Sequence, residues 1–224
     1  MENKKTFTLN LECVKQGYAN GIAPGFPFTE KEKWSMVDEA AEAYGKFLDA
    51  LGCDWRNDPN SSDTPRRVAK AYVFDLWKGR YDAMSDITSF PSDGYQGIVL
   101  EKDIPLISQC SHHHQTIMGV VHIAYIPGPE GNVVGLSKLN RIVDHFGRRG
   151  AIQEQLTMAI HNAIDKICEG NVGVMVMVKA THNCVSCRGV KHQGASMMTS
   201  EVSGVFADHT KTAKMEVLEM IKMG

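Results

Sequence analysis

Two runs of cysteine and histidine, about 70 residues apart, contain side chains that bind transition metals. In the first run, CSHHH, two residues separate Cys110 from His113, which is the spacing of paired metal ligands. In the second run, His182 and Cys184 are two positions apart, so at the end of a strand both side chains face the same side. A Cys-x2-His pair with a cysteine at a distant strand end predicts a discontinuous zinc site.

The number of protein ligands decides what such a zinc does. Three ligands leave a position for water, and the zinc then supplies hydroxide near neutral pH. Four ligands close the site and make it structural, and Cys187 is available as a fourth beside Cys110, His113 and Cys184. The pair Cys184 and Cys187 also has the spacing of a redox dithiol, and buried thiols with hydrogen-bonded histidines are the interpretation without a metal. Spacing alone leaves these alternatives open.

A basic segment indicates an anion site. Ser137 can cap the helix that begins here, and Lys138 and Arg141 lie three residues apart on one face near its start. Residues 137–149 contain four basic side chains and one acidic one, a local charge of +3 in a chain whose net charge is −2. A helix N-terminus beside Lys and Arg suits phosphate, although a basic helix is often only a solvated face. Arg188, after the second cysteine run, can converge with it.

Gln153 and Glu154 stand at the start of the next expected helix. A carboxylate beside an amide can read the edge of a guanine through paired hydrogen bonds. The same two residues are also ordinary in a first helical turn, so their position alone leaves base recognition open.

Hydrophobic periodicity and turn residues predict the elements that position these side chains. A capping box of Thr29 and Glu32 begins a helix that Gly52 ends, and Pro65 lies in the first turn of a second helix that ends at Gly79. The pattern then predicts strands at 119–126, 172–182 and 199–206 and helices at 136–146, 152–167 and 211–223. The result is an α+β chain with two regions: 1–92, an irregular N-terminal arm (1–28) and a helical region, and 93–224, a mixed domain of strands and helices.

Composition excludes several classes of protein. With 224 residues, 43% apolar and 22% charged side chains, the chain matches average soluble globular proteins, and six cysteines are too few for a secreted disulfide scaffold. The near-neutral charge balance gives no indication of a nucleic-acid or membrane partner. No apolar run approaches the ~18 residues of a membrane span, and no apolar segment follows the N-terminal lysines, so we expect no signal peptide and a cytoplasmic location.

Taken together and in this order, the motifs resemble GTP cyclohydrolase I of the tunnelling-fold superfamily. The resemblance rests on TPRRVAK (64–70), CSHH (110–113), VHIAYIP (121–127), VGLSKLNRIV (134–143), QEQLT (153–157), ATHNC (180–184), RG (188–189) and TSEVSGVF (199–206). It implies a tunnelling fold, which is an antiparallel sheet with helices packed on one face, here preceded by a helical N-terminal region.

The resemblance also assigns a role to each candidate residue. It implies one Zn2+ per subunit held by Cys110, His113 and Cys184, with Cys187 not a ligand and the site open for catalysis. The other implied roles are catalysis by His112 and His182, guanine recognition by Gln153 and Glu154, triphosphate binding by Lys138, Arg141 and Arg188, with Arg67 and Lys70 as weaker candidates, and a pocket-lining position for Ser137.

The implied reaction is hydrolysis of GTP at C8, which releases formate and forms 7,8-dihydroneopterin triphosphate, the first step of tetrahydrofolate and pterin biosynthesis. The family also implies a homo-oligomer, a decamer with its sites at subunit interfaces. Three positions depart from the family: Ser111 replaces a glutamate, His114 replaces a phenylalanine or leucine, and Cys187 stands where other residues are common. Because neighbours of metal ligands tune metal affinity, Ser111 bears on metal preference and kinetics.

Two other functions are compatible with parts of this pattern. One is another tunnelling-fold enzyme that acts on a related purine or pterin, and the combination of phosphate-binding residues with the Cys-His-Cys set argues against it. The other is an inactive paralogue with a structural four-ligand zinc and a regulatory or assembly role. Metal stoichiometry measured together with formate release separates these possibilities.

Overall fold

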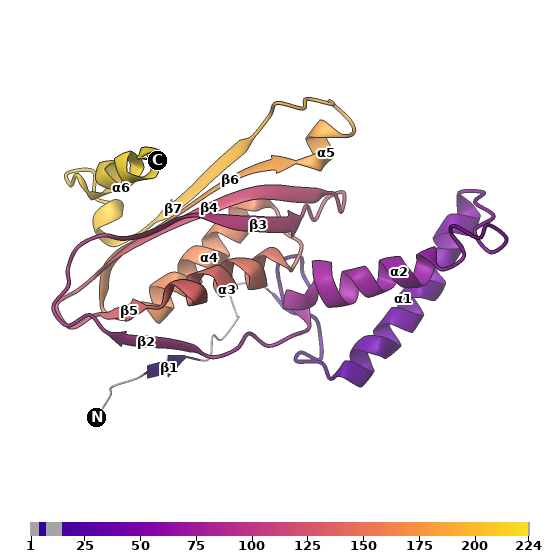
Figure 1. Cartoon of the computed structure of the whole chain (residues 1–224), viewed down its shortest axis with the longest axis horizontal. Helices are drawn as coiled ribbons and strands as arrows, with labels where there is room; N and C mark the ends of the chain where they lie inside the picture. The colour runs from indigo at the N-terminus through magenta and orange to yellow at the C-terminus, as the bar shows by residue number, and fades with distance from the viewer. Residues whose placement is uncertain (1–4, 8–14, 224) are drawn as a thin grey trace.

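The computed structural model describes residues 5–7 and 15–223 of the chain (Figure 1). Its helices are α1 (Glu30–Ala50), α2 (Thr64–Ala71), α3 (Leu136–Gly147), α4 (Gln153–Ile167), α5 (Asn183–Ser186) and α6 (Ala213–Lys222). Its strands are β1 (Lys5–Phe7), β2 (Ile87–Pro91), β3 (Val99–Gln109), β4 (Thr116–Pro127), β5 (Asn132–Val134), β6 (Asn171–His182) and β7 (Met197–Val202). Short turns of other helix types are η1, a π-helix (Tyr72–Leu76), and the 3-10 turns η2 (Lys78–Arg80) and η3 (Gly204–Phe206). None of the helices in the described part is both long and apolar enough to cross a membrane.

Four antiparallel strands in the order β3-β4-β6-β7 form the main sheet. Because side chains alternate between the faces of a sheet, Ile123 and Tyr125 of β4 pack on the side of α3 and α4, while Ala124 faces the other side and packs with Phe206 and with Val217 of α6. Figure 1 shows α3 and α4 along one face of the sheet and α6 over an end of the other. The predicted antiparallel sheet with helices on one face is confirmed, and α6 adds a short helix on the second face.

The two N-terminal helices form a small core of their own. α1 begins at the predicted capping box, in which the Thr29 hydroxyl accepts a hydrogen bond from the Glu32 amide and the Glu32 carboxylate accepts one from the Thr29 amide. Val37 of α1 belongs to one buried cluster with Ala69 of α2 and Val73 of η1, and Figure 1 shows this helical region projecting from one end of the main sheet. The predicted division between residues 92 and 93 stays a prediction, since β2 before it pairs with β5 after it.

Sequence periodicity missed β2, β3 and β5 and misplaced the ends of other elements. After Val99 and Leu100, β3 continues with three charged residues (101–103) and contains a bulge there, where Asp103 has a φ of 61°, so its alternation becomes regular only after the bulge. α2 ends at Ala71, and η1 and η2 follow it in place of a continuous helix to Gly79. The strand expected at 199–206 ends at Val202, because a glycine with positive φ then begins η3.

The N-terminal arm is described at 5–7 and from residue 15 onward. β1 pairs with β2, so that part of the arm is a strand and not irregular, while 15–28 consists of turns, bends and extended chain. The rest of the predicted arm, 1–4 and 8–14, lies outside the described residues.

Strand register brings the two cysteine–histidine runs to one end of the main sheet. Gln109 of β3 pairs with Thr116 of β4, so residues 110–115 form the hairpin loop between these strands. Ile117, the next residue of β4, pairs with His182, the last residue of β6. The start of α5 therefore lies beside that loop, although about 70 residues separate the two in sequence.

We expect Gly119→Ala to weaken the pairing that sets this register. A Cβ atom at Gly119 would lie 2.0 Å from the Lys179 carbonyl oxygen of β6, so the two strands would have to separate. Overpacking of this kind costs roughly 1–3 kcal/mol. Gly194→Ala is the control, because no atom lies within 4 Å of a Cβ at that position. Urea unfolding measures both free energies, and equal stability of the two variants would contradict this role of Gly119.

Candidate functional site

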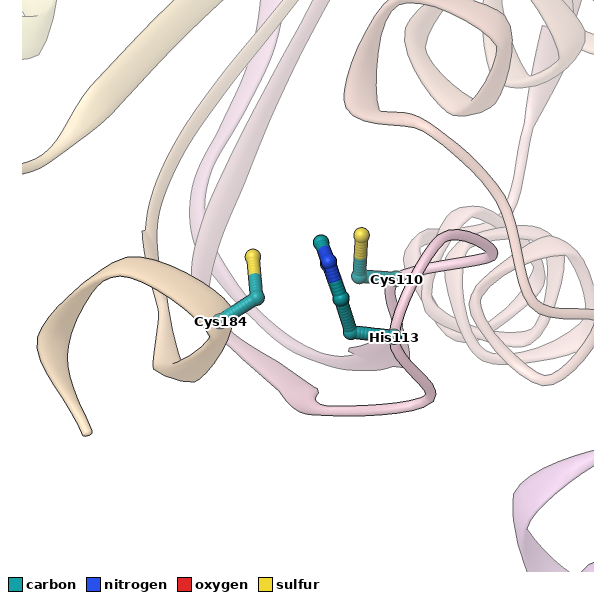
Figure 2. A group of neighbouring side chains, drawn as sticks. All are labelled: Cys110, His113 and Cys184. Atoms are coloured by element: carbon teal, nitrogen blue, oxygen red, sulfur yellow. The ribbon is translucent and has the colours of Figure 1, made fainter. Parts of the chain in front are cut away.

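Cys110, His113 and Cys184 lie together at the end of the main sheet. Cys110 directly follows β3, His113 lies in the hairpin loop, and Cys184 is in the first turn of α5. One sulfur or ring nitrogen atom from each residue lies within 4.8 Å of the other two, and Figure 2 shows the three side chains with their tips side by side. A single chain thus brings the three predicted ligands together, and two sulfur donors with one nitrogen donor can hold a metal ion.

Backbone hydrogen bonds fix the loop that carries two of these side chains. Within the loop, the His114 amide donates to the Cys110 carbonyl at 2.9 Å. From outside the loop, Ala151 between α3 and α4 bridges the chain on either side of Cys110. Its amide donates to the Gln109 carbonyl at 2.9 Å, and its carbonyl accepts from the Ser111 amide at 3.3 Å. These bonds set the loop conformation independently of any metal.

His114 connects the loop to the helical region. Its φ is 52°, in the left-handed region. Its ring meets Trp77 edge-on, with ring centroids 5.0 Å apart, and lies 6.0 Å from the ring of Tyr72 in η1. His114, which departs from the family pattern, therefore makes aromatic contacts that connect the hairpin loop with the residues just after α2.

Two thiols side by side favour a bound cation. Burial raises the pKa of the Cys184 thiol, and the neighbouring Cys110 thiol raises it further because two thiolates repel each other. Arg188 opposes this shift. A divalent cation between the sulfurs removes the repulsion and stabilises both thiolates.

Cys187 is exposed and lies outside this group of ligand atoms, as judged over the described residues. Its sulfur lies 3.7 Å from the hydroxyl of its neighbour Ser186. The described arrangement therefore groups three candidate ligands without Cys187, and a coordination position left open for water stays a prediction.

Gln153 fixes the orientation and the protonation site of His182. The nitrogen of the buried Gln153 amide has three acceptors within 3.2 Å, which are the carbonyl oxygens of Val178 and Met197 and the hydroxyl of Thr199. The amide oxygen is therefore the atom that lies 2.8 Å from His182 Nε2. Because an amide oxygen only accepts, Nε2 carries the proton and Nδ1 is left as the acceptor.

The electrostatic environment keeps His182 neutral. Burial lowers the pKa of His182, and the carboxylate of Glu154 partly opposes that shift, so the ring can accept a proton near neutral pH. Glu154 is exposed beside it. The contact of Gln153 with guanine stays a prediction, and in this chain its amide is hydrogen-bonded inside the protein. His112 is exposed on the hairpin loop, with its ring centroid 6.4 Å from that of His113.

The basic candidates are divided among several places. Arg188 is exposed just after α5, near the ligands. Lys138 and Arg141 extend from the first turns of α3 toward the segment before β2, where they contact the Asp86 carbonyl and the Ser85 hydroxyl, each at 3.4 Å. They do not meet the ligands within one chain. α3 rises roughly 18 Å over its 12 residues, and it is the opposite end of α3 that packs against β3 near the hairpin loop.

Arg67 and Lys70 lie on another helix than the other basic candidates, and the position of Ser137 differs from the predicted one. Arg67 and Lys70 are on α2, where the Arg67 guanidinium pairs with Asp63 at 3.4 Å. Arg141 lines a cavity of about 450 Å³ between α3 and the segment before β2. Ser137 is exposed, and its predicted role as a helix cap is wrong, because α3 begins one residue earlier with Gly135 at its N-cap.

Three residues that support the site escaped sequence reasoning. Ala151 acts through its backbone, Trp77 through a ring contact, and Thr199 as an acceptor for a buried amide. None of these residue types at these positions forms a spacing pattern, so the sequence contains no signal that marks them.

Comparison with known proteins decides the family. The model of a family described as GTP cyclohydrolase I matches residues 40–222. This chain belongs to the GTP cyclohydrolase I family. Relatives named GTP cyclohydrolase 1 from Bacillus mycoides, Bacillus cereus and Bacillus anthracis are each 40% identical over 190 residues, which cover 83% of this chain and 96% of the relative. Among solved structures, the apo form of the archaeosine synthase QueF-Like is similar at a TM-score of 0.39 and 20% identity, over 48% of this chain and 93% of that one.

Membership of the GTP cyclohydrolase I family confirms the resemblance seen in the motifs and places the chain among enzymes of the hydrolase class. The matched residues include every candidate side chain of the site and exclude residues 1–39, which are the arm and the first part of α1. The roles of the individual site residues stay predictions.

We expect the His182 ring to carry its proton on Nε2 at neutral pH, and nitrogen NMR shifts of the ring report the tautomer. Gln153→Met removes the amide oxygen, so the two tautomers should mix. Thr199→Val is the control, because it removes only one of the three acceptors of the Gln153 nitrogen and should leave Nε2 protonated. A wild-type ring protonated on Nδ1 would contradict the hydrogen-bond assignment.

Proposed function

We propose that this chain is a zinc-dependent GTP cyclohydrolase I, which hydrolyses GTP at C8, releases formate and forms 7,8-dihydroneopterin triphosphate, the first step of tetrahydrofolate and pterin biosynthesis. The observation that carries the proposal is the group of Cys110, His113 and Cys184, with the neutral, oriented ring of His182 two residues before Cys184. Family membership supports GTP as the substrate.

The donor set supports zinc as the metal, one ion per subunit. Thiolate and imidazole ligands suit zinc, whereas Mg2+ and Ca2+ prefer oxygen ligands. Cys110, His113 and Cys184 would hold the ion. When bound through three protein ligands, zinc supplies a water molecule activated near neutral pH and polarises the bond under attack.

The chain's own residues bind the base and move protons. Glu154 accepts hydrogen bonds from the guanine N1–H and 2-amino group, which adenine does not present, and this contact directs C8 toward the ligands. His182 exchanges a proton at Nδ1, since Gln153 occupies Nε2. His112 is the second histidine for protons of the imidazole nitrogens and the ribose oxygen. Together they serve addition of water at C8, ring opening, loss of formate and rearrangement of the ribose.

The positions of the basic residues support a homo-oligomer, a decamer with sites at subunit interfaces. Lys138 and Arg141 provide charge for the triphosphate but lie at the far end of α3 from the ligands of their own chain. A neighbouring copy can supply these residues to the ligands, together with Arg188 of the first chain, and Ser137 then lines the same pocket. Arg67 and Lys70 are weaker candidates. The main sheet also has two edge strands, β3 and β7, at which further copies can pair.

The proposal places the enzyme in the cytoplasm, where nucleoside triphosphates are available to it. GTP is its small-molecule partner, and no nucleic acid or membrane takes part. Region 93–224 carries the catalytic domain, and 1–92 provides the arm and the helical region.

Zinc-loaded protein incubated with GTP should release formate and a pterin in equal amounts, with one zinc per chain by metal analysis. Cys110→Ala and Cys184→Ala should each lose both zinc and turnover, because each removes one of three ligands. Cys187→Ala is the matched control and should keep both. Loss of zinc from Cys187→Ala would favour a closed structural site, and a zinc-loaded wild type that releases no formate would refute the reaction.

Cys184→Ala and Arg141→Ala should each have little activity alone, whereas oligomers assembled from a mixture of the two should recover part of it. In a mixed oligomer, some interfaces combine intact ligands from one chain with an intact Arg141 from its neighbour. Cys184→Ala mixed with Cys110→Ala is the control and should recover nothing, because both changes affect the ligands of the same chain. The absence of recovery in the first mixture would argue against a shared site.

A further inference from the structure

Asn20 is a fully buried polar residue in a segment that is otherwise exposed on its N-terminal side. It lies in the arm before the family match at 40–222, and residues 15–19 are exposed. Its φ of 62° is in the left-handed region, which asparagine adopts more readily than most residues. Buried polar groups are held by specific hydrogen bonds, so the partners of Asn20 indicate what this segment does.

Three hydrogen bonds join Asn20 to the turn between α3 and α4 and to the first turn of α4. Its backbone amide donates to the Gly150 carbonyl at 2.6 Å. Its side-chain nitrogen donates to the Gln155 carbonyl at 3.2 Å, and its own carbonyl accepts from the buried guanidinium of Arg149 at 3.4 Å. These partners lie on both sides of Ala151.

The same turn is hydrogen-bonded to the loop that carries Cys110 and His113, and it leads into Gln153, which orients His182. Ala151, the residue after Gly150, bridges the backbone around Cys110. Two residues further on, Gln153 fixes the ring of His182. A displacement of the turn therefore moves the position of Cys110 relative to the other ligands.

The arm segment has its own anchors away from the turn. The Arg80 guanidinium donates to the carbonyls of Tyr18 and Gly17 at 3.0 and 3.3 Å, and the Ala23 amide donates to the Arg80 carbonyl at 3.0 Å. Residues 15–23 are thus fixed to the end of the helical region at one side and to the α3–α4 turn at the other.

We propose that Asn20 is a positioning residue for the metal-ligand loop: residues 15–23 clamp the α3–α4 turn, and the turn sets the place of Cys110 among the ligands. The inference rests on the metal site of the proposed function. It extends that site to a segment that the family match does not include.

Zinc affinity of the full chain, measured by competition with a chromogenic chelator, tests the clamp. Asn20→Ala should weaken zinc binding roughly tenfold, the lower end of the effect of changing a direct neighbour of a metal ligand, in a protein that circular dichroism shows to be folded. Asn171→Ala is the matched control. Its side chain also donates to main-chain carbonyls, those of Asp165 and Cys168 at 3.2 and 3.0 Å, but at the start of β6, away from the ligands. Asn171→Ala should leave zinc affinity unchanged, although its loss of thermal stability should be similar to that of Asn20→Ala.

Asn20→Gly distinguishes the contribution of the Asn20 side chain from that of its backbone conformation. Glycine keeps the left-handed conformation and the bond to Gly150 and loses only the contact with Gln155, so zinc binding should weaken less than in Asn20→Ala. This variant decides the matter if Asn20→Ala does not fold. Zinc affinity equal to wild type in folded Asn20 variants, or an equal loss in Asn171→Ala, would overturn the clamp. A wild type that binds no zinc would instead refute the metal site itself.

Discussion

The backbone bridge between Ala151 and the residues on either side of Cys110 is the contact on which the whole site depends. Strand register brings the hairpin loop and α5 to the same end of the sheet, but a loop of this length has many conformations, and fixing one costs conformational entropy. The bridge selects a conformation in which Cys110 is buried and faces its partners. The tight turn before Ala151 depends on Gly150, whose φ is 74° and where a Cβ would lie 2.9 Å from Trp77 Nε1.

A buried and fully hydrogen-bonded amide makes the part of the site around His182 rigid. The Gln153 amide has partners for both of its polar atoms, so turning it would leave buried groups unpaired at roughly 1–3 kcal/mol each. The hydrogen bond with Gln153 therefore holds the His182 ring in one orientation and one tautomer. On the ligand side, Ser111 uses its amide for the bridge to Ala151 and brings no carboxylate. Among the described neighbours, Arg188 lowers the pKa of the Cys184 thiol, and Ser111 adds no negative charge against it.

The sequence was sufficient to predict which side chains form the candidate site, but not the contacts that hold them in place. Cys110, His113 and Cys184 could be found because few residue types bind transition metals and strand ends bring distant short motifs together. The sheet and its covering helices followed from periodicity. β3 was missed because the bulge at Asp103 breaks its alternation, and the contribution of Ala151 was missed because a backbone hydrogen bond has no residue signature. The distance between the ligands and the basic end of α3 also depends on tertiary packing, which spacing does not encode.

The cations on and near α3 differ in what already neutralises them, and this difference bears on where an anion binds. Lys78 and Arg148 pair with the carboxylate of Asp144 at 2.7 and 3.1 Å, so their charge is largely compensated. In the described part of the chain, Lys138 and Arg141 contact only a carbonyl and a hydroxyl, at 3.4 Å. They also lie near the positive end of the helix dipole. An anion therefore gains charge-assisted hydrogen bonds there without first breaking an ion pair. Since Lys138 and Arg141 lie at the opposite end of α3 from the Cys-His-Cys group of their own chain, a substrate that contacts both would require a second copy of the chain, as in the proposed homo-oligomer.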